Sequence, residues 1–549
     1  MNRHSDSDVI VVGGGHNGLV CAGYLARSGL RVTVLERRAR LGGPAGTQDF
    51  MPGYRSTITN SPGSLEPKVI ADLELERFGL EFVRPNPTLV HPLPGNRLFL
   101  GWRESEKTQD QLESYATGES ARYQGLLDYV QWFANRLGIS LFEPPPSLKE
   151  LVRNLDSIEE QEAFSRFFFG SVRSLFDEFG LAEETKAVMG PLATVSGIVG
   201  PSTPGTPFGL MMRPLSLASL ASDSTDDPRR MPLRGSTGLP IGGMGAIIDA
   251  MERSLLARGV AIHREASVSR IVCDQDGVES VQLDDGTVHR APIVVSAMNP
   301  YLTVAVIDGP DPFWADLRAK IVRKPLKGKA FKIVLGLGDI PRYSAARSEE
   351  EARTLASAQF RIAPTLDYLD DSYADMLRGR VPENPIVWGL CHSLTSPILA
   401  PEGKHVLSLN IGNAPYTLRE GNWATEKHKL FERVIAKTAE WIPNLPDIIE
   451  DYHYLDPGEF EDEFSLVEAN ITHGDVLPYK QFWMRPLPGL HRYRTPARGL
   501  YLSGAGTWPG NFVSGIPGHN TAQEVLRDLA SGHLSLEKPR IHHAGTAGE

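Results

Sequence analysis

A glycine-rich hexapeptide near the N-terminus constrains the fold of this chain more than any other feature. Its sequence is Gly13-Gly-Gly-His-Asn-Gly18, which fits the pattern G-x-G-x-x-G. A short β-branched run, Asp8–Val12, precedes it, and apolar residues at helical spacing follow it as far as Ala26. A second β-branched run, Arg31–Glu36, comes next. The sequence therefore predicts a strand–helix–strand unit, whose parallel strands need a right-handed crossover and a sheet covered on both faces.

The spacing of these glycines also predicts a nucleotide site. In such a unit Gly13 permits the tight turn, Gly15 lets the backbone approach a pyrophosphate, and Gly18 lets the helix pack on the strand. The N-terminus of the helix then faces the phosphates. Glu36 ends the second strand, 18 residues after Gly18, near the spacing at which a carboxylate binds the hydroxyls of an adenosine ribose. Together these features favour dinucleotide binding over an ordinary glycine-rich turn.

Composition and charge exclude several other classes of function. The 549 residues include 67 Asp and Glu against 56 Lys and Arg, a net charge of −11, so no basic surface for nucleic acid is expected. The three cysteines are far apart and form no CxxC pair, which predicts neither a disulfide framework nor a metal site. The sequence shows no secretion signal and no apolar run long enough to span a membrane. We expect a cytoplasmic protein, with peripheral contact to a membrane left open.

The residues after Glu36 introduce a family resemblance. Glu36 leads through Arg37 to a second glycine pair, Gly42–Gly43, and this arrangement resembles the flavoprotein superfamily of amine oxidases, phytoene desaturases and GDP-dissociation inhibitors. Further motifs occur in matching order along almost the entire chain, from Asp8 to Leu529. The whole pattern is similar to phytoene desaturase-like proteins and, within them, to the subgroup called pyridine nucleotide-disulfide oxidoreductase domain protein 2. The further motifs are Gly242–Gly245, Val294–Pro300, Met484–Pro486, Gly499–Gly510 and Ser514–Asn520.

The resemblance implies FAD as the cofactor and assigns its contacts by motif. One position departs from the family pattern, because Pro44 follows the second glycine pair where many relatives have Arg. That contact is lost or replaced here. The implied contacts are Gly13, Gly15 and Gly18 with the pyrophosphate, Glu36 with the ribose, Arg37, Gly42 and Gly43 on the adenosine and phosphate side, Val268 with adenine, Gly504, Ala505 and Gly506 near the ribityl phosphate, and Gly515 and Ile516 at the pyrimidine edge of the flavin.

The catalytic base is not assigned by the sequence. A flavin accepts a hydride at N5 when a neighbouring base removes a proton from the substrate. His519, Lys480 and His473 are candidates for this base. A structural role fits His519 at least as well, a solvent-exposed position is favoured for Lys480, and His473 is similarly open. Phenylalanines at helical spacing between Phe164 and Phe179 predict a core helix. The alternatives for that stripe are the lining of an apolar tunnel and a surface that contacts a membrane.

The expected fold class is α/β, with a Rossmann-like FAD-binding domain interleaved with a substrate domain of mixed or antiparallel sheet plus a helical region. The polar segment Ser222–Arg230 is expected to be a loop near a cavity or a flap. The expected segments are 6–88, 235–300 and 466–529 for the FAD domain, 89–234 and 301–465 for the substrate domain with its helical cap, and 530–549 for a mobile tail.

The resemblance implies an FAD-dependent oxidoreductase that exchanges a hydride between flavin N5 and a C–C or C–N bond of a small apolar molecule, with oxygen or a quinone as electron acceptor. Desaturases, saturases and isomerases all fit this description. An amine or amino-acid oxidase is an alternative, which would need a carboxylate-binding arginine such as Arg485 and an aromatic wall such as Trp508. A lipid or isoprenoid carrier without catalysis is another. The substrate, the direction of the reaction and the oligomeric state stay open.

Overall fold

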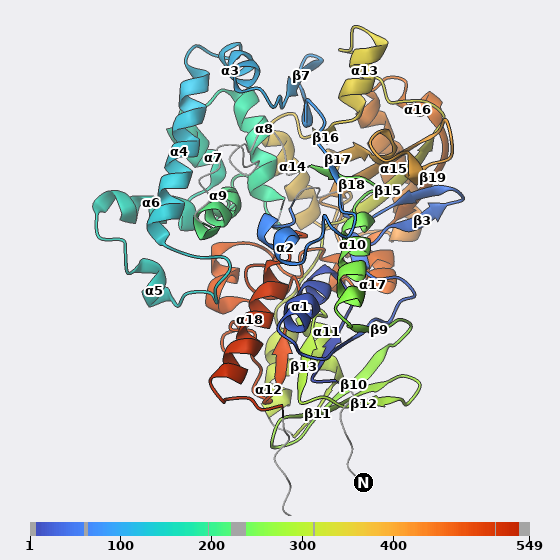
Figure 1. Ribbon diagram of the computed structural model, residues 1–549. Helices are drawn as coiled ribbons and strands as arrows, with labels where there is room; N and C mark the ends of the chain where they lie inside the picture. Colours follow the sequence, from blue (N-terminus) through green and yellow to red (C-terminus); the bar gives the residue numbers. More distant parts are fainter. Residues whose placement is uncertain are drawn as a thin grey trace, which may run out of the picture.

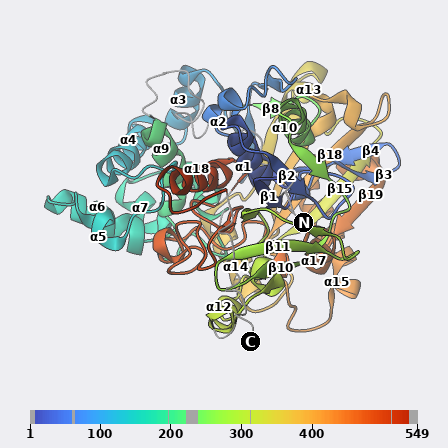
Figure 2. The same cartoon turned by 60° about the horizontal axis from the view of Figure 1, so that its bottom comes forward.

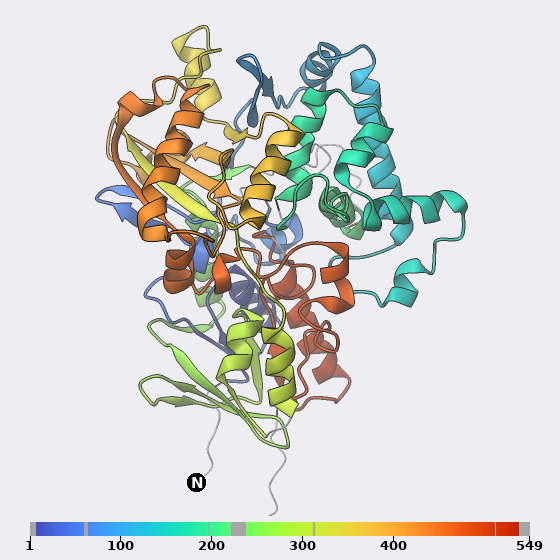
Figure 3. The same ribbon diagram turned by 180° about the vertical axis from the view of Figure 1, so that it is seen from behind.

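The computed structural model describes residues 7–59, 64–195, 197–220, 238–310, 313–510 and 512–536. Figure 1 shows three regions: a layered region around α1 at the bottom, a large sheet at the upper right, and a group of helices at the upper left. The view from behind shows the same division with the sides exchanged (Figure 3). The expected α/β fold, with a Rossmann-like part interleaved with a second sheet and a helical region, is confirmed.

The layered region is built on a five-stranded parallel sheet. Four-residue β-branched strands form its centre and are buried along their whole length, which explains their uninterrupted apolar sequence. α1 and α18 lie side by side on one face of this sheet, with α10 next to α1 (Figure 2). In sheet order the strands are β20 (Leu500–Leu502), β13 (Ile293–Ser296), β1 (Val9–Val12), β2 (Val32–Leu35) and β9 (Ala261–His263), and the helices are α1 (His16–Arg27), α10 (Gly245–Ala257) and α18 (Ile516–Ala530).

The alternation of side chains along β1 explains how both faces of this sheet are covered. Val9 and Val11 pack against the helices, whereas Ile10 and Val12 pack against a second, four-stranded sheet. The result is a layer of helices, a parallel sheet and a further sheet. The second sheet contains β12 (Val288–His289), β11 (Val278–Leu283), β10 (Val268–Cys273) and β14 (Ile307–Asp308), flanked by α11 (Pro300–Val306) and α12 (Phe313–Val322).

A seven-stranded, mostly antiparallel sheet forms the second large region. One of its faces packs against helices α13, α15 and α16, and the other faces the helical region. In order the strands are β19 (Ile449–Leu455), β15 (Phe331–Leu337), β18 (His405–Gly412), β17 (Ile386–Cys391), β16 (Gln359–Ile362), β6 (Leu89–Leu93) and β7 (Arg97–Leu100), and the helices are α13 (Glu349–Ala356), α15 (Trp423–Ala439) and α16 (Leu445–Ile448).

The phenylalanine stripe belongs to the core of the helical region. Phe167 and Phe176 are fully buried, and Phe168 stacks on Phe482, whereas Phe169 at the end of α6 is 69% exposed. Core packing therefore explains most of the stripe. The helices of this region are α3 (Ser105–Glu113), α4 (Glu119–Leu137), α5 (Leu148–Val152), α6 (Ile158–Phe169), α7 (Val172–Glu178), α8 (Glu183–Thr194), α9 (Phe208–Leu220) and α14 (Leu366–Leu377).

Short elements connect the three regions. The expected loop Ser222–Arg230 and residues 537–549 of the expected tail lie outside the described residues. No helix of the described part is both long enough and apolar enough to cross a membrane. The short elements are α2 (Pro67–Asp72), α17 (Pro457–Phe464), β3 (Gln48–Met51), β4 (Tyr54–Ser56), β5 (Phe82–Val83), β8 (Leu239–Pro240), η1 (Gly43–Ala45), η3 (His392–Leu394), η4 (Pro397–Leu399), η5 (Val467–Ala469), η6 (Pro478–Lys480) and η7 (Phe482–Met484).

Candidate functional site

Three loops meet at the carboxyl edge of the parallel sheet, after β1, β13 and β20. The Cα of Gly13 lies so close to the loop after β13 that an added Cβ would be 3.5 Å from the carbonyl carbon of Ala297. An added Cβ on Gly504, after β20, would be 2.8 Å from the carbonyl oxygen of the same Ala297. The carboxyl ends of parallel strands are where α/β folds of this kind bind nucleotides.

The three motif glycines Gly13, Gly15 and Gly18 have different surroundings, and these fit the three roles expected of them. Gly13 has a φ of +104°, in the region that favours glycine. A Cβ on Gly18 would overlap the carbonyl oxygen of Gly13, so only glycine lets α1 begin this close to β1. A Cβ on Gly15 would meet no atom within 4 Å, so open space lies beside this residue. That space fits the approach of a pyrophosphate to the backbone.

Glu36 and the second glycine pair lie against the first loop. The Glu36 carboxylate is 7% exposed and accepts hydrogen bonds from the backbone N–H groups of Gly14, at 2.8 Å, and Arg38, at 2.9 Å. Each carboxylate oxygen keeps a further lone pair for a ribose hydroxyl. Gly42 N donates to Gly14 O at 2.8 Å, and Gly43 has open space on its Cβ side. The two glycine loops are thus held together beside a free volume.

The adenosine side of the site is only partly assembled from the expected residues. Val268 begins β10, two residues after Ala266, whose N–H donates to the Glu36 carbonyl at 2.8 Å. This places the expected adenine contact next to the expected ribose contact. The Arg37 side chain instead is exposed and donates from Nη2 to the Glu463 carbonyl oxygen, at 3.0 Å, towards α17. Pro44 O accepts a hydrogen bond from Thr59 N at 3.3 Å, which links this turn to the following segment.

The flavin side is marked by the N-terminus of α18. Gly515 precedes the helix with a φ of +78° and has no side chain that could cap it. The Ile516 N–H donates to Ser514 Oγ at 3.3 Å, and Pro517 has no N–H to offer. This terminus therefore offers a ligand mainly the positive end of its helix dipole. A Cβ on Gly518 would overlap the carbonyl oxygen of Asn17, which shows how closely α18 approaches α1. Gly506 packs against the Pro300 ring in the same way. Ile516 lines the large cavity described below.

Unpaired polar atoms around these loops show that the residues present fit a dinucleotide. Enclosed side-chain atoms are usually hydrogen-bonded, and among the described residues several that are not lie on or beside the glycine loops. Phosphate, ribose and ring atoms of FAD would give them partners. Burial lowers the pKa values of His16 and His473 to about 4, so both rings are neutral at pH 7. The unpaired atoms near the loops are His16 Nε2, Asn17 Oδ1, Asn299 Nδ2, His473 Nδ1 and Ser503 Oγ.

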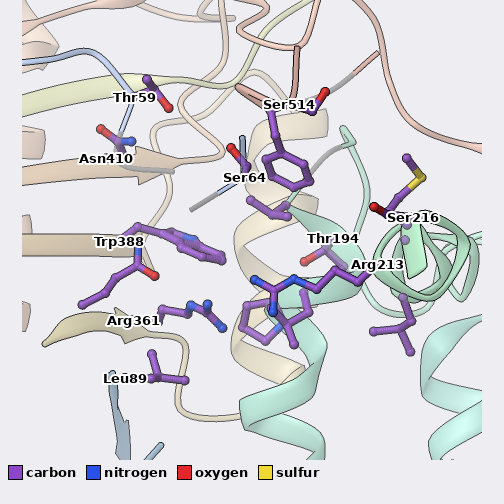
Figure 4. A pocket seen from close by; sticks show the side chains of 18 of the residues that line it. Thr59, Ser64, Leu89, Thr194, Arg213, Ser216, Arg361, Trp388, Asn410 and Ser514 are labelled. Carbon is purple, nitrogen blue, oxygen red and sulfur yellow. The ribbon is translucent and has the colours of Figure 1, made fainter. Parts of the chain in front are cut away.

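A cavity with a volume of about 550 Å³ lies between the helical region, the seven-stranded sheet and the N-terminus of α18 (Figure 4). This volume is in the range of small-molecule sites. Polar side chains on its sheet wall form one row in the strand register, in which Arg361 pairs with Trp388 and Trp388 with Asn410. Apolar residues from every wall make up most of the lining, among them Leu89, Met189, Leu210, Leu369, Ile386 and Ile411.

Lys329 is a cavity residue that the sequence did not single out. It precedes β15 and donates from Nζ to the Thr194 carbonyl oxygen at 3.2 Å. Burial lowers its pKa to about 8, against the opposing influence of Asp475, so a substantial fraction of this amine is neutral near that pH. The one signal for it in the sequence is the run Lys329–Leu337, which has the pattern of a strand, and a strand pattern does not show which residues line a cavity.

The three candidate bases lie outside the cavity lining. Lys480 is 40% exposed and forms an ion pair with Asp475 at 2.5 Å. His519 is buried, hydrogen-bonds Asn520 at 2.9 Å and packs edge-on against the Tyr24 ring. His473 lies near the glycine loops instead, where His16 and Arg485 help to lower its pKa.

Arg485 and Trp508, expected as parts of an amine oxidase site, have structural positions. Arg485 is 3% exposed and donates to five backbone carbonyl oxygens, at distances between 2.5 and 3.3 Å. Its donors are therefore already occupied by the protein. Trp508 is fully buried, stacks on Phe482 and donates from Nε1 to the Glu143 carbonyl oxygen at 3.2 Å. Neither side chain lines the cavity, whose indole is Trp388.

Comparisons with known proteins agree with this geometry. The chain is 27% identical to pyridine nucleotide-disulfide oxidoreductase domain-containing protein 2 of Rattus norvegicus, over 95% of this chain and 94% of the relative. It is 25% identical to the lycopene-forming phytoene desaturase of Pseudescherichia vulneris, over 95% and 99% of the two chains. The fold matches an oxidoreductase from Methanosarcina mazei with a TM-score of 0.59 at 16% identity, over 94% and 99% of the two chains.

The sequence profile of one family covers more than half of the chain. It is described as flavin containing amine oxidoreductase and matches residues 18–324. The match begins at Gly18 and therefore includes Glu36 and the second glycine pair. The chain belongs to the family of flavin-containing amine oxidoreductases and is an FAD-dependent oxidoreductase.

Proposed function

We propose that this oxidoreductase exchanges a hydride between flavin N5 and a C–C or C–N bond of a largely apolar small molecule, as a desaturase or dehydrogenase does. The observation that carries the proposal is the cavity, which is lined mainly by apolar side chains and extends to Ser514 and Ile516, where the flavin edge is expected. The relative from Pseudescherichia vulneris, named a phytoene desaturase, supports an apolar substrate.

The chain's own residues would perform three tasks in this reaction. FAD, when bound, supplies the hydride acceptor. The apolar walls exclude water and hold the substrate by burial of its surface. The N-terminus of α18 would favour negative charge on a flavin ring beside it, through the positive end of its helix dipole. Lys329 is our proposed base, because it is an amine of the cavity lining and its pKa of about 8 lets it accept a proton.

The same proposal covers the electron acceptor and the location. We propose that oxygen or a quinone takes the electrons and that the protein acts in the cytoplasm, with peripheral contact to membranes. Exposed apolar side chains on α5 and α6 support that contact, since Leu148, Ile158 and Phe169 are 54%, 72% and 69% exposed.

Two linked experiments test the proposed function. The visible spectrum of the purified protein, followed by heat release and chromatography, is expected to give a stoichiometry near one FAD per chain. The holoenzyme is then mixed without oxygen with apolar polyenes, acyl derivatives and amines, and loss of flavin absorbance is recorded. We expect bleaching by an apolar compound. Bleaching by amines alone would show an amine oxidase, and a protein that takes up no FAD would favour the carrier alternative.

A further inference from the structure

A buried cation in the cavity lacks a hydrogen-bond or ion-pair partner among the described residues. Arg361, on β16, is 8% exposed, and its Nε and Nη1 atoms are enclosed without a hydrogen bond. Charged groups at this depth are normally paired or hydrogen-bonded, because losing water is costly for an ion. Burial and the charge of Arg213 lower the pKa of Arg361 to about 9, which still leaves it protonated at pH 7. The charge therefore persists at a place where none of the residues that the structure describes supplies a counter-ion.

The strand register holds Arg361 in this position. It stands opposite Trp388 in the antiparallel pair of β16 and β17, and its guanidinium carbon lies 4.3 Å from the centre of the indole ring. Stacking on an indole face attracts the cation but leaves the in-plane N–H groups without acceptors. The side chain is thus fixed by its neighbour while its hydrogen-bonding capacity stays unused.

A second guanidinium faces the first across the cavity. Arg213 belongs to α9, and Figure 4 shows its side chain directed towards Arg361 from the opposite wall. Both residues line the cavity. Two like charges brought together in a low-dielectric space repel each other, and an anion between them removes that repulsion. Arginine forks bind planar carboxylates through two parallel hydrogen bonds, which makes a carboxylate the best-fitting anion.

The carboxylates of the lining do not fill this position. The Glu66 carboxylate accepts a hydrogen bond from Ser216 Oγ on α9 at 2.8 Å, and its backbone N–H donates to the Ser514 carbonyl oxygen at 3.2 Å, so Glu66 joins α9 to the α18 end of the cavity and forms no ion pair with Arg361. Asp128 on α4 is exposed and accepts from Gln124 at 2.8 Å. No ion pair among the described residues joins Arg361 to an acidic side chain.

We propose that the cavity recognises an amphipathic carboxylate, whose head group binds between Arg361 and Arg213 and whose apolar body extends towards Ser514 and Ile516. Figure 4 shows Ser514 well apart from the two arginines, so the head group and the flavin edge lie at different places of one cavity. That this ligand is the substrate rests on the proposed function. The binding site itself does not, because it follows from the arginines and the apolar lining.

Calorimetric titration of the FAD-loaded protein tests the site directly. Decanoate, 1-decanol, decylamine and decyl phosphate serve as probes with the same chain and different head groups. We expect decanoate to bind at least about tenfold more tightly than 1-decanol, because a charge-assisted hydrogen bond is worth roughly that factor or more. Arg361→Met should remove this advantage and leave 1-decanol binding unchanged, and Arg361→Lys should restore part of it. Arg378→Met, at an exposed arginine of the same protein, is the matched control and should change neither affinity.

The possible results separate the binding site from the proposed function. Equal decanoate affinity in the wild type and in Arg361→Met, or tightest binding of decylamine, would overturn the carboxylate site. Tighter binding of decyl phosphate than of decanoate would overturn the choice of a carboxylate. Far-ultraviolet circular dichroism and retained FAD show whether the variant is folded. Decanoate binding that depends on Arg361, without flavin bleaching by any apolar compound, would support the site and contradict the proposed hydride exchange with an apolar substrate.

Discussion

Arg361 and Trp388 face each other across two neighbouring strands, and the guanidinium carbon of the one lies 4.3 Å from the ring centre of the other. This pair shows how the seven-stranded sheet contributes side chains to a site whose glycine loops belong to the parallel sheet. The stacked indole fixes the cation in an apolar wall without neutralising it. An apolar residue at this position should therefore favour the stability of the fold, whereas the arginine favours binding of an anion.

Replacement of a buried arginine by methionine is expected to lower the stability of the protein at Arg485 but not at Arg361. Arg485→Met should lower the free energy of unfolding by about 3–5 kcal/mol, because five backbone carbonyl groups lose their donor. Arg361→Met should leave the thermal midpoint of the ligand-free protein unchanged or raised, because a buried unpaired charge is replaced by an apolar side chain of similar length. Calorimetric melting of both variants measures this. Equal destabilisation would show that Arg361 has a structural partner.

Alanine substitutions at two glycines of the first loop are expected to have different effects, one on FAD binding and the other on the stability of the fold. Gly15→Ala places a Cβ in open space, and the φ of −70° at this residue suits alanine, so the protein without FAD should melt as the wild type does. Its FAD affinity should fall, because the Cβ occupies the space expected for the pyrophosphate. Gly18→Ala should lower stability itself by about 1–3 kcal/mol, because the Cβ overlaps Gly13 O.

Fluorescence titration of the protein without FAD, together with its melting temperature, distinguishes these two effects. Added FAD should raise the melting temperature of the wild type more than that of Gly15→Ala, since a ligand stabilises the state that binds it. Unchanged FAD affinity in Gly15→Ala would show that the pyrophosphate does not bind beside Gly15.

The strand–helix–strand unit with its glycine-rich turn could be predicted from the sequence because its constraints are mostly local. A Cβ on Gly18 would overlap the carbonyl oxygen of Gly13 in the same loop, and Gly13 itself has a backbone φ of +104°. The strands before and after α1, β1 and β2, are buried on both faces, and their sequences are therefore almost entirely apolar and β-branched. Such features are visible in a window of about thirty residues, as strand–helix–strand units are.

The cavity residues could not be found in this way. Lys329, Arg361 and Arg213 come from three elements that are adjacent only in the tertiary structure. The strand that carries Arg361 has four residues, too few for a clear alternation of apolar and polar side chains. Arg485, which the sequence suggested as a carboxylate ligand, is instead surrounded by the backbone carbonyls of its own neighbouring loops. The sequence shows that an arginine is present and can bind a carboxylate. It does not show whether backbone carbonyl groups of the protein already use the hydrogen-bond donors of that arginine.

Lys329 is expected to govern the pH dependence of flavin reduction. A base must be unprotonated to act, so the anaerobic rate of flavin reduction should rise with pH through about 8, the pKa of Lys329. Lys329→Met should lower that rate by about 10²–10⁴-fold and flatten the pH profile. The same change at Lys429, an exposed lysine on α15 outside the cavity lining, should leave the rate unchanged. A profile that survives in Lys329→Met would assign the base to another group.

His91 on β6 is expected to contribute to loss of stability in acid. It is fully buried, shares a hydrogen bond of 3.1 Å with the Ala363 carbonyl oxygen, and its pKa is lowered to about 3 by burial and by the charge of Arg361. In the unfolded chain a histidine takes up its proton near pH 6.5, so below that pH the unfolded state binds more protons than the folded state. Stability is therefore lost as the pH falls from 6.5 towards 3, by up to about 1.4 kcal/mol per pH unit for this one group.

Replacement of His91 by a side chain that does not titrate tests this account. His91→Gln keeps a donor for the Ala363 carbonyl, so the fall in melting temperature between pH 6.5 and 4 should be less steep than in the wild type. The decrease will not vanish, because burial also lowers the pKa values of His16, His392 and His473. His428→Gln, at a half-exposed histidine on α15, is the control and should leave the slope as it is. Identical slopes for the wild type and His91→Gln would show that the ring at this position is already protonated in the folded protein or does not titrate on unfolding.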